Sequence, residues 1–164
     1  NVTAGTTTAT MDYDATVLDI GASVNIGNAN LVAYYYSGEG VGSTLMGGLE
    51  GAAAGSGVAG TASSGADAVG NERDSDGGYI QATYVIPTGT KLGVAYGVSR
   101  LDLSNQESQT ANMLDENNRW TVGAYHPLTK HLNLVAEYND IESKSHNGLN
   151  NESSAVSLGA ILFF

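Results

Sequence analysis

Apolar and polar side chains alternate with a period of two through most of the chain. The even positions from 16 to 26 read Thr, Leu, Ile, Ala, Val and Ile, whereas the odd ones include Asp19, Ser23 and Asn25. A period of two puts successive side chains on opposite faces of a β-sheet. Seven strands are predicted on this basis, at residues 15–26, 31–37, 80–86, 92–99, 119–125, 132–139 and 155–164. In 31–37, three consecutive tyrosines leave open which side chains point inward.

The connections between these strands alternate between short and long. Short turns are expected at 27–30, 87–90 and 127–130, and long polar loops at 38–77, 104–118 and 143–153. Outer-membrane barrels have short turns at one rim and long external loops at the other, and their strands span the bilayer with about 9–11 residues. The pattern therefore predicts an all-β, transmembrane antiparallel β-barrel in one domain, 1–164, with 38–77 as a long Gly/Ala-rich extracellular loop. No run of 18 apolar residues occurs, so the chain has no candidate transmembrane helix.

The charged residues limit the possible binding partners and indicate which face of the predicted sheet points inward. The net charge is −11, from 6 basic and 17 acidic residues, which argues against a nucleic-acid partner because such a protein needs a basic face. The chain has no cysteine, so disulfides and thiolate metal sites are excluded. Within the predicted strands, Asp19 and Glu137 both fall on the less apolar face, and we therefore expect that face to point inward.

The stretch from 78 to 164 resembles the C-terminal part of Gram-negative trimeric porins of the general-diffusion type. The segments that carry the resemblance are Gly78–Tyr84, Thr90–Tyr96, Trp120–Lys130, Leu132–Tyr138 and Val156–Phe164. The resemblance implies a homotrimer in the outer membrane, in contact with its lipid and lipopolysaccharide, that lets small hydrophilic solutes and ions diffuse passively. The last segment resembles an outer-membrane insertion signal, with alternating apolar residues and a terminal aromatic: Val156, Leu158, Ala160, Leu162 and Phe164.

The strand count leaves two architectures open. Single-chain bacterial barrels have an even number of strands, and water-filled porins have about 16–18. The preferred interpretation is therefore the C-terminal half of a barrel of about 16 strands. The alternative takes residues 2–10 as an eighth strand of a small, non-conducting barrel that serves as an adhesin, anchor or phage receptor. Its inward face, rich in Gly, Ala, Ser and Thr, would fill such a barrel poorly.

The candidate pore-lining residues are polar side chains on the inward face, where wall charge biases ion selectivity. They are Asp19, Asn25, Gln81, Thr83, Arg119, Thr121, Asn133 and Glu137. Arg119 is the most interesting of them, since it is a lone base on an otherwise acidic face. The acidic balance of the chain predicts a preference for cations.

Other charged residues suggest weaker hypotheses. Acidic residues in the loops could hold Ca²⁺ or Mg²⁺ or bridge them to lipopolysaccharide: Asp67, Glu72, Asp74, Asp76, Asp115 and Glu116. Asp74 and Asp76 resemble the start of a calcium loop, but the glutamate that such a loop needs downstream is missing. Arg100 has outward parity near the outer rim, where it could meet a lipid phosphate or simply extend to the surface. The three histidines lie in turns and loops, away from a hydrolase-like arrangement, so no catalytic residue is expected.

Overall fold

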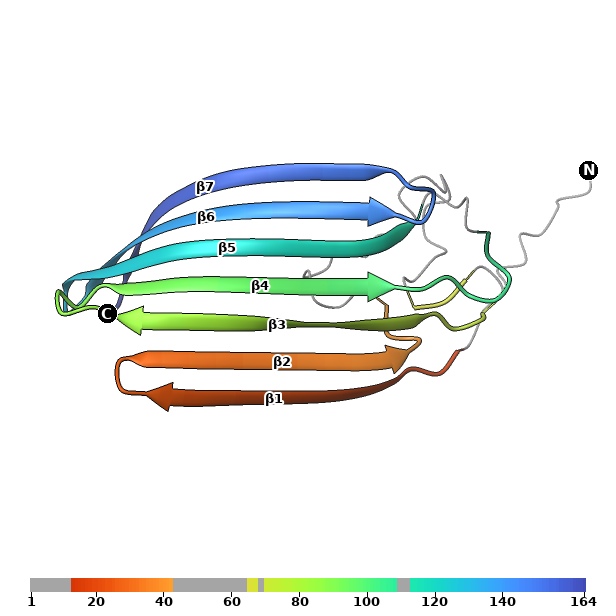
Figure 1. Ribbon diagram of the computed structural model, residues 1–164, viewed down its shortest axis with the longest axis horizontal. Helices are drawn as coiled ribbons and strands as arrows, with labels where there is room; N and C mark the ends of the chain where they lie inside the picture. Colours follow the sequence, from red (N-terminus) through yellow and green to blue (C-terminus); the bar gives the residue numbers. More distant parts are fainter. Residues whose placement is uncertain (1–12, 43–64, 68–69, 109–112) are drawn as a thin grey trace, which may run out of the picture.

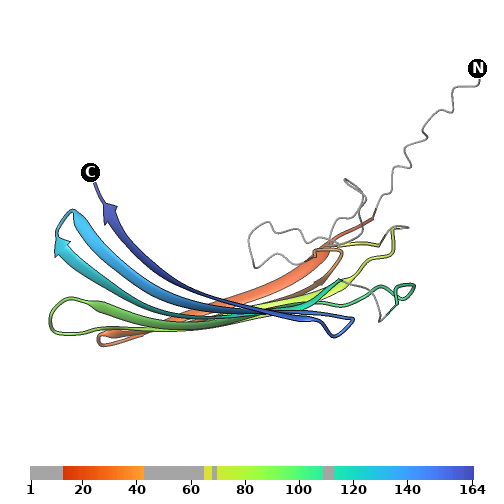
Figure 2. The same cartoon turned by 90° about the horizontal axis from the view of Figure 1, so that it is seen from above.

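The computed structural model describes residues 13–42, 65–67, 70–108 and 113–164. They form a single antiparallel sheet in which the strands lie side by side in chain order, from β1 at one edge to β7 at the other (Figure 1). The strands are β1 (Thr16–Ile26), β2 (Ala29–Glu39), β3 (Asp74–Val85), β4 (Lys91–Leu101), β5 (Leu114–Thr129), β6 (Leu132–Ser145) and β7 (Asn150–Leu162). The sheet is twisted and curved like part of a barrel wall, and it is not closed (Figure 2). The described ranges contain no helix with the length and hydropathy of a membrane span.

All seven predicted strands are present, which confirms the all-β assignment, but most are longer than the sequence pattern indicated. β3 begins at Asp74, β5 begins at Leu114 and β7 begins at Asn150. These additions lie at the rim that carries the long loops, where the outward side chains change from apolar to charged. The backbone ladder continues there although the apolar alternation that reveals a strand has ended.

The loops are correspondingly shorter than expected. Gly38 and Glu39 belong to β2 and Asp74 to Gly77 to β3, so the connection expected at 38–77 is confined to 40–73. The connection expected at 143–153 is a four-residue turn, 146–149, which contradicts the prediction of a long loop at this place. The predicted turn at 127–130 is also displaced, since Pro127 to Thr129 continue β5 through an irregularity and only residues 130–131 form the turn.

The opposite rim has tight turns, as predicted. β1 and β2 are joined by Gly27 and Asn28 alone, with Ile26 paired to Ala29. Gly27 has a φ of 58°, a conformation that two-residue hairpin turns require and that glycine adopts without strain.

The two faces of the sheet differ sharply in exposure. On the convex face large apolar side chains are bare even on the inner strands, as in Ile80, Trp120 and Val122 with exposures of 62%, 49% and 53%. The concave face is polar and rich in small residues, and it is the less exposed face along β2. The described apolar residues that are buried, Tyr36, Ala66 and Leu101, gather at the long-loop end of the sheet. A soluble protein would not leave so wide an apolar surface uncovered, whereas a lipid bilayer covers it.

The eighth strand of the alternative architecture, at residues 2–10, lies outside the described residues.

Candidate channel wall

The strand register places all eight predicted pore-lining residues on the concave face. Cross-strand partners share a face, so each row of partners can be followed across the sheet. One row joins Asn25 through Asn30 and Thr83 to Glu137. The remaining five predicted residues lie on the same face in neighbouring rows: Asp19, Gln81, Arg119, Thr121 and Asn133. Their placement follows the prediction, while a role in a pore belongs to the proposal below.

Arg119 is held on the wall by uncharged partners. Its Nη2 donates to Asn139 Oδ1 at 2.6 Å, and its Nε donates to Asn139 Oδ1 and to Thr121 Oγ1, both at 3.1 Å. Thr121 also donates to Asn139 Oδ1 at 2.8 Å. Within the described part of the chain, Arg119 forms no ion pair with a carboxylate. Its full charge is therefore presented to the concave side, in a fixed position.

A second cluster lies nearer the rim with the tight turns. The Tyr125 hydroxyl donates to Glu137 Oε1, and Lys91 Nζ is 5.2 Å from the centroid of the Tyr125 ring. A Cβ on Gly123 would lie 2.9 Å from the Tyr125 hydroxyl oxygen, so only glycine there leaves room for the ring in this position. Lys91, Gly123 and Tyr125 line a small groove of about 100 Å³ on the concave face, together with Thr83 and Thr121.

The first two consecutive tyrosines of β2 point to opposite faces. Tyr34 lies on the concave face between Gly21 and Tyr79, whereas Tyr35 lies on the convex face opposite Ile20. Tyr36 is again on the concave face, is 2% exposed, and its hydroxyl lies 2.9 Å from Ser99 Oγ. The sequence left this parity open, and the register now assigns two of the three tyrosines to the wall.

Loop residues beyond the long-loop rim form a packed cluster. Arg73 is 3% exposed and binds Glu107 with both ends of its guanidinium, Nη2 to Oε1 at 2.6 Å and Nε to Oε2 at 2.8 Å. The backbone N–H of Ser104 also donates to Glu107 Oε2, at 3.0 Å. The hydrogen bonds from Arg73 hold the pKa of Glu107 below its ordinary value, because they outweigh the effect of burial. This pair joins the 40–73 connection to the 102–113 connection.

Asp67 belongs to the same cluster. Its carboxylate accepts hydrogen bonds from the Ser104 hydroxyl at 2.7 Å and from the Asn71 side-chain amide, also at 2.7 Å. Sequence reasoning had no means to find these contacts, because they join residues up to 37 positions apart in connections without a repeating pattern.

The convex face carries a row of alternating charges just beyond the apolar band. Asp76, Arg100, Glu116 and Lys144 are successive cross-strand partners. Arg100 binds Glu116 at 2.8 Å and Asp76 at 3.4 Å, and Lys144 binds Glu116 at 3.3 Å. Arg100 therefore has protein carboxylates as partners.

The predicted acidic metal ligands are dispersed. Asp67 bonds to Ser104 and Asn71, Glu72 accepts from the Asp14 backbone, and Asp115 lies 3.9 Å from His146. Across the described ranges, no three His, Cys, Asp or Glu side chains are grouped so that they could hold a metal ion.

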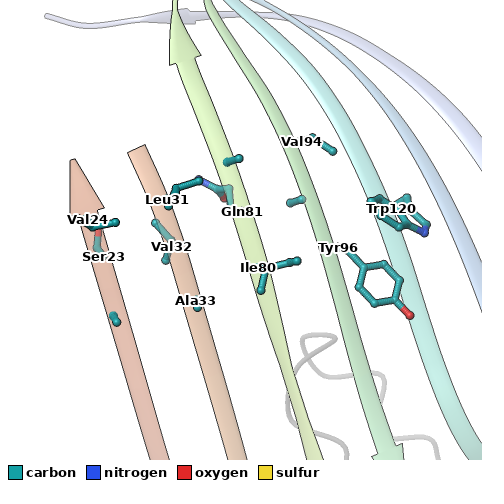
Figure 3. A pocket seen from close by; sticks show the side chains of 13 residues that line it. Ser23, Val24, Leu31, Val32, Ala33, Ile80, Gln81, Val94, Tyr96 and Trp120 are labelled. Carbon is teal, nitrogen blue, oxygen red and sulfur yellow. The ribbon is translucent and has the colours of Figure 1, made fainter. Parts of the chain in front are cut away.

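Below the charged row, the convex face is apolar with shallow grooves between the side chains. A groove of about 410 Å³ crosses β1 to β5 where small residues such as Ala22 and Ala33 leave space beside larger ones. Ile80, Tyr96 and Trp120 border it (Figure 3), and the Tyr96 and Trp120 rings are 4.6 Å apart. Val156, Leu158, Ala160 and Leu162 of β7 lie on this same face. Such a surface suits flexible acyl chains.

A curved antiparallel sheet with an apolar convex face and a polar, glycine-rich concave face defines a segment of an outer-membrane barrel wall. A family model for Gram-negative porins matches residues 1–146, so the chain belongs to the Gram-negative porin family, whose place is the outer membrane. The resemblance drawn from the sequence is confirmed, but its extent differs. The match includes residues 38–77, which lie outside the stretch 78–164 that carries the resemblance, and it ends before the closing segment 156–164.

A solved structure supports the same fold. The outer membrane channel DcaP of Acinetobacter baumannii matches with a TM-score of 0.70 and 14% identity, over 91% of this chain and 41% of that one. At this identity the likeness concerns the fold alone. The chain spans about two fifths of that channel. No curated protein matches the sequence.

Proposed function

We propose that this chain forms part of the wall of a water-filled diffusion channel for small hydrophilic solutes and ions, closed by further strands to a barrel of about 16. The observation that carries the proposal is the opposition of the two faces: an apolar convex face for lipid, and a concave face of small and polar side chains with fixed charges. A channel of this kind catalyses no reaction, and its discrimination arises from width and wall charge.

The proposed preference for cations is supported mainly by the charges at the long-loop end of the sheet, which would form the mouth of the channel. The charges on the concave face of the strands support it less. On the concave face of the strands, Asp19 and Glu137 are balanced by Lys91 and Arg119. The described connections at the long-loop end add five carboxylates and one arginine, namely Asp67, Glu72, Asp102, Glu107, Asp14 and Arg73. A mouth of this sign raises the local concentration of cations and repels anions.

Assembly and lipid contacts are proposed on narrower grounds. The family resemblance favours a homotrimer, and the apolar convex face supplies the area that a subunit contact or lipid would cover. Lipopolysaccharide would meet the row from Asp76 to Lys144, where alternating charges and bridging Ca²⁺ or Mg²⁺ could both contribute. The role of 156–164 as an insertion signal also belongs to this proposal.

Planar-bilayer recording of the full-length protein tests the proposed channel. Stepwise conductance increases in KCl, with a reversal potential of cationic sign across a salt gradient, are expected. A protein that inserts into the membrane yet passes no current would overturn the channel and favour the receptor or anchor alternative. An anionic reversal potential would overturn the cation preference alone. Chemical cross-linking in the membrane tests the trimer.

A further inference from the structure

The wall formed by β1 to β3 carries two exposed aromatic rings beside a carboxylate. Tyr34 and Tyr79 are cross-strand partners on the concave face, with ring centroids 5.8 Å apart and planes tilted by 32°. The Tyr34 hydroxyl donates to Asp19 Oδ2 at 3.4 Å. Neither ring is buried, since Tyr79 is 36% exposed and Tyr34 is intermediate. Aromatic faces and a negative oxygen are therefore presented together to the concave side.

Glycines on both sides give this pair its shape. A Cβ on Gly21 would lie 3.4 Å from Tyr34 Cδ2, and a Cβ on Gly97 would lie 3.4 Å from Tyr79 Cβ. The two tyrosines thus stand between two positions without side chains. Behind them, the buried Tyr36 lies 6.4 Å from Tyr34, centroid to centroid, and supports it from the long-loop side. The rings form a fixed platform with open space at each end.

The charge of Asp19 is not neutralised by this part of the wall. The concave face of β1 to β3 carries no lysine or arginine, and Asp19 takes part in no ion pair within the described residues. The nearest base in this row of the sheet is Arg119 on β5, and strand β4 lies between it and Tyr79. A cation at the platform therefore meets one carboxylate without a competing base in contact.

We propose that Asp19, Tyr34 and Tyr79 form a binding site on the channel wall for organic ammonium ions. An alkylated ammonium is weakly hydrated and is attracted both by aromatic faces and by a carboxylate. A small inorganic cation keeps its water and gains from Asp19 alone, while a neutral sugar could stack on the rings but would not use the charge. The site would slow organic cations relative to K⁺ as they pass. This inference deepens the proposed channel and rests on it.

The test compares block of the channel by tetramethylammonium in several variants. Single-channel KCl current of the full-length protein is recorded while tetramethylammonium chloride is added. The double variant Tyr34→Leu/Tyr79→Leu should weaken block by about two- to fivefold for each ring, and Asp19→Asn should weaken it as well. Tyr35→Leu is the matched control, because Tyr35 is the adjacent tyrosine on the convex face, and it should leave block unchanged.

Further measurements separate the alternatives. Tyr34→Phe/Tyr79→Phe keeps both rings and should keep most of the block, which assigns the block to the rings and not to the hydroxyl groups. A leucine variant whose KCl current without tetramethylammonium equals that of wild type is correctly folded. Unchanged block in the leucine variant, with loss only in Asp19→Asn, would mean simple charge attraction and would overturn the site. Stronger binding of a neutral disaccharide than of tetramethylammonium would also overturn it. Calorimetric titration of the detergent-solubilised full-length protein with tetramethylammonium distinguishes the two proposals: binding without conductance would refute the channel and leave the site standing.

Discussion

The buried ion pair between Arg73 and Glu107 should control the order of the connections at the long-loop rim. Replacing Arg73 by methionine removes two charge-assisted hydrogen bonds and leaves the Glu107 carboxylate with the Ser104 N–H. The side chains are only 4% and 17% exposed, so water cannot replace the guanidinium fully. Removing one partner of a buried pair costs about 3–5 kcal/mol, which corresponds to a roughly 100- to 4,000-fold increase in local opening.

Hydrogen exchange followed by mass spectrometry measures this opening in the full-length protein. The informative amides are those of Gly40 and Arg73, which donate to Arg73 O at 3.0 Å and to Gly65 O at 2.9 Å. Arg100→Met is the control, since the Arg100 side chain is 47% exposed and exposed pairs contribute about 0–1 kcal/mol. The double variant Arg73→Met/Glu107→Leu should recover much of the protection. Equal exchange in Arg73→Met and Arg100→Met would refute the assignment of the pair as the link between the two connections.

The same pair should respond to acid. The pKa of Glu107 is lowered by Arg73, so its contribution to stability is complete above the ordinary glutamate pKa of about 4.3 and is lost as the pH falls through the lowered value. Protection of wild type relative to Glu107→Gln, measured at each pH, should therefore stay constant above about pH 5 and decline below about pH 4. A ratio that is constant down to pH 2 would mean that the charge of Glu107 contributes nothing.

Three further substitutions, one of them paired with a control substitution, test the faces of the sheet. Arg119→Glu reverses a charge that has only uncharged partners, so the reversal potential should become more cationic. An unchanged reversal potential would mean that the charge of Arg119 does not act on the permeating ions. Gly123→Val puts a Cβ 2.9 Å from the Tyr125 hydroxyl oxygen and should displace that ring into the lumen, which lowers single-channel conductance if the concave face is the channel side. Leu158→Lys puts a charge on the lipid face and should cost about 2–4 kcal/mol near the bilayer midplane, measured by urea unfolding in vesicles, whereas Ser157→Lys on the concave face should cost much less.

The sequence predicts the faces of the sheet better than the ends of its strands. Within the bilayer, a shift of the strand register by one residue would turn apolar side chains toward water, so the alternation of apolar and polar residues is strictly kept. The residues of the concave face could therefore be assigned from their odd or even position in the strand. Beyond the bilayer both faces are wet. Residues such as Asp76 and Glu116 then occupy outward positions that look like loop in the sequence, although the ladder of backbone hydrogen bonds continues through them.

The packed cluster of loop residues around Arg73 and Glu107 could not be predicted, and the reason is different. The Arg73–Glu107 pair joins residues 34 positions apart, and neither neighbourhood has a periodic pattern that would place them together. Such a contact depends on how two irregular connections pack above the sheet, which is a property of the tertiary structure. The parity of Tyr34, by contrast, became clear once its partners Gly21 and Tyr79 were known.

The glycines of the wall favour an open channel over a filled barrel. The chain contains 22 glycines, and several lie on the concave face next to a tyrosine: Gly21 beside Tyr34, Gly97 beside Tyr79 and Gly123 beside Tyr125. In a small closed barrel, opposing side chains must fill the interior at normal packing density, and glycines at these positions would leave voids. In a wide barrel the same glycines let large rings lie beside the backbone, so that the wall stays thin while aromatic and hydroxyl groups remain available to solutes. These glycines would therefore leave the core of a small closed barrel poorly packed, whereas in a wide barrel they keep the channel open.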